Sequence, residues 1–229
     1  MSDKIIDGQV YESNDALLKA QSLWAKYGKY ITAFLIGFVV AIGGFIAYKQ
    51  FVTKPKEEKA AEAIYKAQQY FQLDSSKLVL DGDGSNKGVL YIMKNYGGTK
   101  AANLAHYYAG VSYLKLGDFN KAIEHLKDFS TNAKQIQAAA YGVLGDAYAE
   151  AGKKDDAVSS YTKASKTFEF DDALSSEYLF RAALLSSTIG KSKEAVALFK
   201  ALKEKFPKTE KAAQADKYIN TLVVEKADF

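Results

Sequence analysis

The strongest constraint on the fold is an internal repeat in the second half of the chain. Three turns, marked by Gly117, Gly152 and Gly190, stand 35 and 38 residues apart. An alanine follows each glycine after five positions, and a large side chain follows each alanine after four. The alanines are Ala122, Ala157 and Ala195, and the large residues are Leu126, Tyr161 and Phe199. A period of this length is typical of helical solenoids, so the sequence predicts an all-α repeat fold.

The spacing within one unit predicts two helices joined at a glycine turn. Glycine allows the left-handed backbone that often ends a helix. The alanine stands where the two helices cross, because a larger side chain would push them apart. The large residue four positions later lies on the same helix face and fills the layer against the next helix.

These positions resemble the tetratricopeptide repeat family, whose first helix carries a small residue and then a tyrosine. The corresponding residues are Gly110 and Tyr113, then Gly145 and Tyr148, and, as a departure from the pattern, Ala183 and Ser186. Pro207 matches the proline that closes a unit, and three extra residues near 168–172 precede the third unit. The resemblance implies antiparallel helical pairs stacked side by side.

Weaker copies flank the three clear units. The segment 95–103 echoes the segment 205–214, and both would join one helix to the next. We therefore expect residues 57–96 to form a degenerate first unit, with a helix over 57–73, a polar loop, and a helix over 87–95. A closing helix is expected over 209–222, so the repeat domain, residues 52–229, would hold about three to four pairs.

An uncharged run near the N-terminus predicts a transmembrane helix. Tyr30 to Tyr48 contains 19 residues without a charge, which span about 28 Å at about 1.5 Å each, close to a hydrocarbon core of about 30 Å. The run is long for a signal peptide, begins late, and is not followed by an A-x-A cleavage site. We assign residues 30–51 to the membrane helix and residues 1–29 to a short N-terminal tail.

The orientation of this helix does not follow from charge alone. Lysines flank both ends in nearly equal number: Lys19, Lys26 and Lys29 before it, and Lys49, Lys54, Lys56 and Lys59 after it. The positive-inside rule therefore does not decide. A short tail without an export signal usually stays in the cytoplasm, which would place the repeats on the outside.

Two further features belong to this N-terminal region. Ala33, Gly37, Ala41 and Gly44 form a small-residue ridge that would let another membrane helix approach closely, although small residues are also simply common in such helices. Residues Asn14 to Tyr27 are expected to form a short amphipathic helix, with Leu17, Leu18 and Trp24 at the interface; a disordered tail is the alternative.

Composition excludes several classes of chemistry. The chain has no cysteine and only two histidines, so thiol nucleophiles, cysteine-ligated metals and multi-histidine sites are excluded. The net charge of +4 arises mainly beside the apolar run, and Arg181 is the single arginine. Phosphate and base recognition favour arginine, so we expect no nucleic acid partner.

Candidate catalytic motifs fail on inspection. The loop Asp81–Asn86 lacks the glycine and glutamate of a calcium loop. Ser112–Lys115 and Ser160–Lys163 match S-x-x-K but lie inside repeat helices without a K-T-G motif. Neither His106 nor His125 has a paired nucleophile. We therefore expect a protein that is not an enzyme and that has no metal or cofactor.

A short solenoid offers a concave groove lined by its first helices. The resemblance to tetratricopeptide repeats places nine positions there: Tyr107, Val111 and Lys115; Gly142, Asp146 and Ala149; and Phe180, Leu184 and Thr188. This surface is rather apolar and lacks the lysine and asparagine pairs that grip a terminal carboxylate. It suits extended or helical apolar segments, unless some of these residues pack under the neighbouring unit.

The whole layout resembles the YfgM-like family of bacterial inner-membrane proteins. The resemblance is carried by Trp24–Lys29 leading into the membrane run and by the alanine-rich helix Lys59–Tyr70. It implies an ancillary subunit of the Sec translocon, with its repeats in the periplasm. Its implied partners are translocon subunits, a membrane-anchored periplasmic folding factor of the prolyl-isomerase type, and newly exported polypeptides. The alternatives are a scaffold subunit of another envelope machine, for secretion, motility or the cell wall, and a cytoplasmic repeat adaptor of inverted topology.

Overall fold

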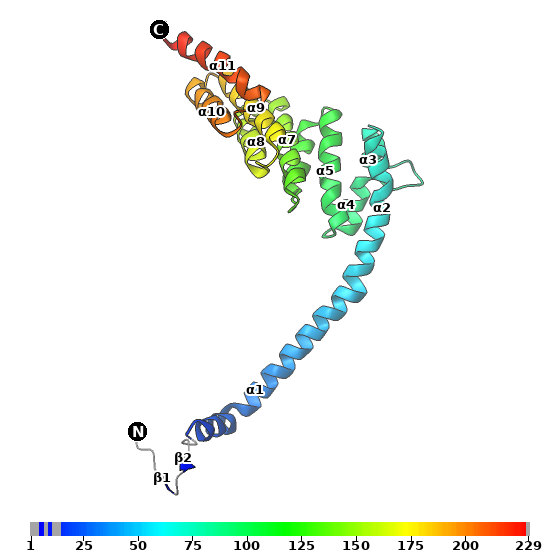
Figure 1. Ribbon diagram of the computed structural model, residues 1–229. Helices are drawn as coiled ribbons and strands as arrows, with labels where there is room; N and C mark the ends of the chain where they lie inside the picture. The colour runs from blue at the N-terminus through cyan, green and yellow to red at the C-terminus, as the bar shows by residue number, and fades with distance from the viewer. Residues whose placement is uncertain (1–4, 7–8, 11–14, 228–229) are drawn as a thin grey trace. The chain divides into compact units, whose positions relative to one another are not determined.

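The computed structural model describes residues 5–6, 9–10 and 15–227, and the chain divides into two units, Met1–Pro55 and Lys56–Phe229. The first unit contains the strands β1 (Ile5–Ile6) and β2 (Gln9–Val10), which pair antiparallel, and the helix α1 (Asp15–Tyr48). Figure 1 shows α1 as a long helix drawn in blue.

The helix continues beyond α1 through a π-helical turn, η1 (Lys49–Thr53), into α2 (Lys54–Gln72). Pro55 explains the wider turn, because proline has no N–H and its ring clashes with the carbonyl four residues before it. The N–H of Lys54 instead reaches back to the carbonyl of Lys49. The continuous helix from Leu18 to Gln72 is long and apolar enough to cross a membrane.

The predicted amphipathic segment is helical from Asp15 onward. It forms the first turns of α1 and continues into the apolar run, so it is not a separate helix. Asn14, the expected first residue, lies outside the described residues. Gly28 stands between the amphipathic segment and the apolar run. Glycine is a weak helix former, but one glycine destabilises a helix by only about 1 kcal/mol relative to alanine.

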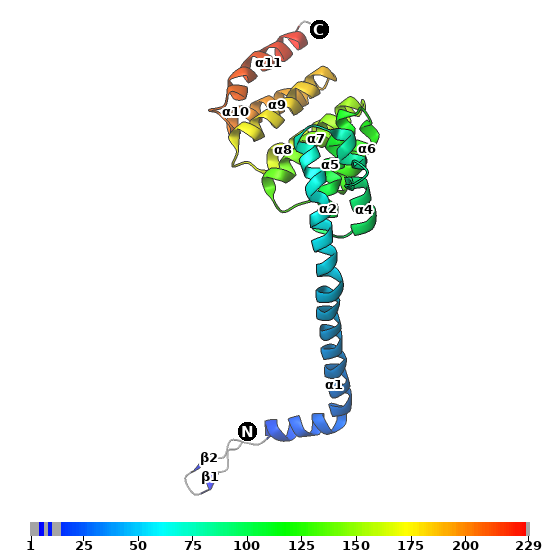
Figure 2. The same ribbon diagram turned by 90° about the vertical axis from the view of Figure 1, so that its right-hand side faces the viewer.

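The second unit is a series of helices stacked in chain order (Figures 1 and 2). After α2 come α3 (Ser76–Asp81), α4 (Val89–Tyr96), α5 (Lys100–Lys115), α6 (Phe119–Asp128), α7 (Lys134–Glu150), α8 (Lys154–Thr167), α9 (Asp172–Thr188), α10 (Ser192–Lys205) and α11 (Glu210–Ala227). The pairs α5–α6, α7–α8 and α9–α10 are the three predicted units, and each helix from α3 onward packs on its neighbours in the chain.

The repeat positions have the predicted roles. Gly117, Gly152 and Gly190 have φ values of 81°, 73° and 79°, which L residues with a side chain rarely adopt. Each of the three crossing alanines is completely buried. At Gly110 a Cβ atom would lie 2.4 Å from the side chain of Leu126, and at Gly145 it would lie 2.5 Å from Tyr161. These glycines therefore allow the close approach of the two helices in a pair.

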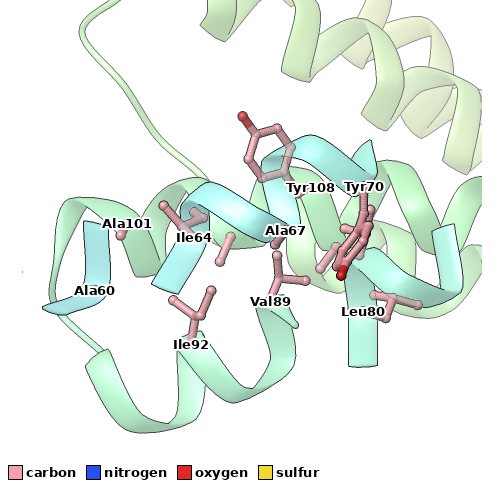
Figure 3. Packing of buried hydrophobic residues seen from close by; sticks show 12 residues of the cluster. Ala60, Ile64, Ala67, Tyr70, Leu80, Val89, Ile92, Ala101 and Tyr108 are labelled. Atoms are coloured by element: carbon pink, nitrogen blue, oxygen red, sulfur yellow. The ribbon is translucent and has the colours of Figure 1, made fainter. Parts of the chain in front are cut away.

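The degenerate first unit forms around α2, α3 and α4. The predicted helices over 57–73 and 87–95 correspond to α2 and α4, whereas α3 falls in the segment that the sequence assigned to a polar loop. Val79 and Leu80 of α3 are buried in one cluster with residues of α2, and α3 packs on α4 and α5. Figure 3 shows the cluster, in which Ile64 and Ala67 of α2 lie close to Val89 and Ile92 of α4.

The two connectors that resemble each other in sequence have the same local structure. Thr99 Oγ1 donates to the carbonyl of Tyr96 and accepts from the N–H of Ala102 at the start of α5. Thr209 Oγ1 makes the same two bonds at the start of α11. A threonine in this place caps a helix by satisfying a free backbone N–H, so α11 starts as the first helix of a further unit would.

Candidate protein-binding site

An apolar pocket lies on the first helices of the repeat unit, between α2, α5 and α7. Its volume is about 390 Å³. The apolar lining consists of Phe71, Leu104, Tyr107, Tyr108, Ile136 and Ala139, and the polar lining consists of Gln68, Gln72 and Gln135. Tyr107, a predicted groove residue, is among the residues that line this pocket.

Aromatic rings form one wall of this pocket. The ring of Phe71, near the end of α2, lies 4.6 Å from that of Tyr108 and 6.4 Å from that of Tyr107. The Tyr107 ring also packs at 5.3 Å on Phe129, which is buried. Side chains that are fixed by such packing lose little entropy when a partner binds. Opposite them, Ile136 at the start of α7 is 46% exposed.

The polar groups of the pocket are neutral. Burial raises the pKa values of both tyrosine hydroxyls, at Tyr107 and Tyr108. Both hydroxyls therefore keep their protons near neutral pH. The glutamine side chains offer amide donors and acceptors without charge. The pocket combines apolar surface with neutral hydrogen-bonding groups, which suits an uncharged polypeptide segment.

The other two groove residues predicted for the same repeat unit, Val111 and Lys115, lie outside the apolar pocket. Lys115 is exposed and forms an ion pair with Asp74, and its ammonium group lies 5.9 Å from the centre of the Phe71 ring. It borders a second, more polar cavity of about 640 Å³ with Asp74 and Ser75. Val111 is half-buried on α5. Neither residue lines the apolar pocket.

In the second unit the predicted positions form a bridge between repeats. Gly142 is buried, and a Cβ atom there would lie 2.2 Å from the ring of Tyr178 in α9. Asp146 accepts hydrogen bonds from the Tyr161 hydroxyl at 2.7 Å and from Arg181 at 3.0 Å. Ala149 is half-buried beside α8. Tyr178 therefore fills the space over Gly142, and Asp146 holds α7 to α8 and α9.

The bridge continues as an ion-pair network toward α11. Arg181 donates to Glu177 at 2.7 Å, and Lys211 lies 2.9 Å from the same carboxylate. Burial opposes ionisation of Glu177, but the hydrogen bonds from these two cations hold its pKa below the usual value. Burial and the bond to Asp146 raise the pKa of Tyr161. The network is internally neutralised, so its charges serve the contacts between helices.

In the third unit one predicted groove residue belongs to the core. Phe180 is only 7% exposed, and its ring packs at 5.7 Å on Phe199 and at 5.4 Å on Tyr218. The helix α11 covers it, so Phe180 does not line an open groove. Leu184 is half-buried against the same cluster. Thr188 is exposed at the end of α9 and donates to the carbonyl of Leu185.

The small-residue ridge of α1 is open in the described structure. An added Cβ atom at Gly37 or Gly44 would meet no described atom within 4 Å, and Ala33 and Ala41 are exposed. A role for this ridge in contacting another membrane helix remains a prediction.

The residues of the candidate catalytic motifs are buried or form local hydrogen bonds. Asp83 accepts a hydrogen bond from the Tyr70 hydroxyl at 2.5 Å and further bonds from Asn86, which together close the loop. Ser112 is buried, and Ser160 donates to the carbonyl of Asp156 within its own helix. Among the described residues, no group of three or more His, Asp or Glu side chains is placed to hold a metal ion.

Sequence reasoning missed several functional candidates. Phe71 and Gln68 come from α2, which lacks the repeat signature, and Ile136 lies at the very start of α7. The sequence patterns also gave no sign that His106 and His125 are neighbours in the fold. The structure brings them together: His106 Nδ1 lies 3.3 Å from His125 Nδ1, and the His125 ring stacks on Tyr113.

Comparison with known families agrees with this architecture. A family described as a tetratricopeptide repeat-like domain matches residues 21–141, which is more than half of the chain. A second family, described as a tetratricopeptide repeat, matches residues 143–210. The chain therefore belongs to the tetratricopeptide repeat-like proteins, which typically bind protein partners and are typically not catalytic. No curated protein matches the chain.

Proposed function

We propose that this protein is a membrane-anchored interaction subunit that holds uncharged, apolar segments of newly exported polypeptides in the pocket between α2, α5 and α7. The observation that carries the proposal is the neutral, aromatic lining of that pocket, on a repeat array of a protein-binding family. A charged segment would lose its hydration there without finding an opposite charge. An apolar segment would instead gain contact with Phe71, Tyr107 and Ile136.

Anchoring supports this function. The repeat-like family match begins at residue 21 and thus includes the apolar run of α1. A binding module fixed to a membrane works at a high effective concentration near emerging chains, so a shallow pocket of modest affinity suffices. We place the repeats in the periplasm and the N-terminal tail in the cytoplasm of a bacterial inner membrane.

The resemblance to the YfgM-like family supplies the particular assembly. In this proposal the protein is an ancillary subunit of the Sec translocon that works beside a periplasmic prolyl-isomerase-type folding factor. The test is purification from native membranes in mild detergent, with mass spectrometry of the associated proteins. Recovery of translocon subunits with the isomerase supports the proposal. Recovery of a different envelope complex without the translocon refutes it and favours the scaffold role.

The pocket is tested separately with a matched pair of variants. Ile136→Glu places a charge at the pocket wall on a side chain that is already half exposed. Asn132→Glu changes the net charge equally, four residues away, at an exposed position outside the pocket. Crosslinking to an arrested exported chain should fall for Ile136→Glu and stay unchanged for Asn132→Glu. Equal crosslinking by both variants would exclude this pocket as the binding surface.

A further inference from the structure

The first turns of α1 have two distinct faces. Ala20, Leu23, Trp24 and Tyr27 follow the i, i+3, i+4, i+7 spacing of one helix face, and Lys19, Ser22, Lys26 and Lys29 occupy the opposite face. The stretch 18–29 contains three lysines and no acidic residue. It therefore has the composition of a basic amphipathic helix.

The apolar face is open to the surroundings. Leu23 and Trp24 are each 58% exposed, and Tyr27 is also exposed. Contiguous exposed apolar side chains of this size mark an interaction surface. Tryptophan and tyrosine are the residues that favour the boundary between lipid tails and headgroups. The same helix continues directly into the apolar run, so a bilayer that holds this run lies next to this face.

The helix also bends near its N-terminal end, as Figure 2 shows. Two local features favour a bend there. Gly28 is a flexible helix residue, and Thr32 Oγ1 donates to the Gly28 carbonyl at 2.8 Å, a bond that often bends helices. Gly28 also gives room to Trp24, whose ring would lie 3.3 Å from a Cβ atom at this position. A bend allows the first turns to leave the direction of the apolar run.

The lysines indicate which lipid this surface fits. The ammonium groups of Lys26 and Lys29 lie 5.2 Å and 4.9 Å from the ring centres of Tyr27 and Tyr30. Cations therefore stand beside the aromatic residues at the expected depth of the headgroups. Anionic lipids attract basic residues at this depth, and no carboxylate within residues 18–29 opposes that attraction.

We propose that residues 18–29 form an interfacial helix that lies in the plane of the bilayer, with Leu23 and Trp24 among the acyl chains and the lysines on anionic phospholipid headgroups. This inference rests on the membrane anchoring proposed above. The interfacial helix fixes the depth and the direction of the apolar run, because a helix lying flat opposes sliding of the anchor through the membrane.

The chain offers a clean probe, since Trp24 is its only tryptophan. The full-length protein is placed in nanodiscs whose lipids carry bromine at the upper acyl chain. We expect strong quenching of Trp24 emission and weak quenching by aqueous acrylamide. In purely zwitterionic nanodiscs, or after Lys19, Lys26 and Lys29 are replaced by Gln, acrylamide quenching should rise. Efficient acrylamide quenching in every lipid, with no effect of bromine, overturns the proposal.

A matched cysteine pair separates a flat helix from one that continues straight into water. The chain has no cysteine, so Ala20→Cys and Ser22→Cys each create a single label site. The two positions differ by about 3 Å in height but by about 200° around the helix. A flat helix predicts that a soluble maleimide labels Ser22→Cys about tenfold faster than Ala20→Cys, because one face is in lipid. Equal rates refute the flat helix.

The same experiments distinguish a failure of the proposed membrane anchoring from a failure of the interfacial helix. If the protein did not enter nanodiscs at all, the proposed membrane anchoring would fall together with this inference. If it entered and the cysteine pair reacted equally, only the interfacial helix would be refuted.

Discussion

Replacing Phe199 by alanine tests whether the third unit and α11 form one local core. Phe199 is completely buried in α10. Its ring stacks on Tyr218 of α11 at 5.2 Å and meets Phe180 of α9 edge-on at 5.7 Å. A buried Phe→Ala change costs about 3–5 kcal/mol, and aromatic pairs of this kind add about 0.5–1.5 kcal/mol beyond their area. The loss should therefore fall in the upper part of that range.

The effect should remain local, because each unit of a solenoid contacts only its neighbours. A loss of about 4 kcal/mol raises the opening equilibrium of the affected helices by roughly a thousandfold, at about 1.4 kcal/mol for each tenfold change. Hydrogen exchange measured by mass spectrometry should show lost protection in α9, α10 and α11. Protection of α2 and α5, which hold the aromatic wall of the pocket, should stay unchanged.

Phe170 provides the control, since it is the same residue type and is 96% exposed. Phe170→Ala should change the free energy of unfolding by less than about 0.5 kcal/mol. If Phe170→Ala cost as much as Phe199→Ala, burial would not explain the effect. If Phe199→Ala loosened α2 and α5 as much as α10, the description of the units as separable would be wrong.

Three further predictions address single contacts. Tyr161→Phe removes the hydrogen bond to Asp146 and should cost about 1–2 kcal/mol in urea unfolding; an unchanged midpoint would show that the bond contributes nothing. Gly117→Ala places a side chain at a φ of 81° and should cost about 1 kcal/mol in urea unfolding, whereas Gly117→Asn should cost less, because asparagine adopts this left-handed backbone more readily; equal midpoints for Gly117→Ala and wild type would contradict the argument. Burial, with a smaller effect of His106, lowers the pKa of His125. Near and below the usual histidine pKa, the folded state thus binds fewer protons than the unfolded state. The free energy of unfolding should therefore be highest above about pH 6.5 and should fall as the pH drops below that value. His125→Gln should flatten this dependence in denaturation curves between pH 5 and 8, and a dependence that survives the change would assign it to other groups.

The sequence predicted the repeats well, because the constraints behind them are local. The positive φ of Gly117 strongly favours glycine, and Ala122 is completely buried where two helices cross. Such positions restrict the residue type wherever the unit occurs. The helix α3 was missed for the opposite reason. It is six residues long, too short to show a helical period, and its contacts come from α4 and α5.

The groove residues show where repeat patterns stop being informative. A family pattern assigns Phe180 and Tyr107 to equivalent positions of two first helices, yet one is core and the other lines the pocket. The difference comes from the helix that stands next to each of them in the stack. Phe180 is covered by α11 through Tyr218, whereas the space beside Tyr107 is bordered by the beginning of α7, where the side chain of Ile136 stands partly exposed. Whether a first-helix residue can meet a partner is therefore decided by the next element along the solenoid, and that element must be placed before a binding surface can be assigned.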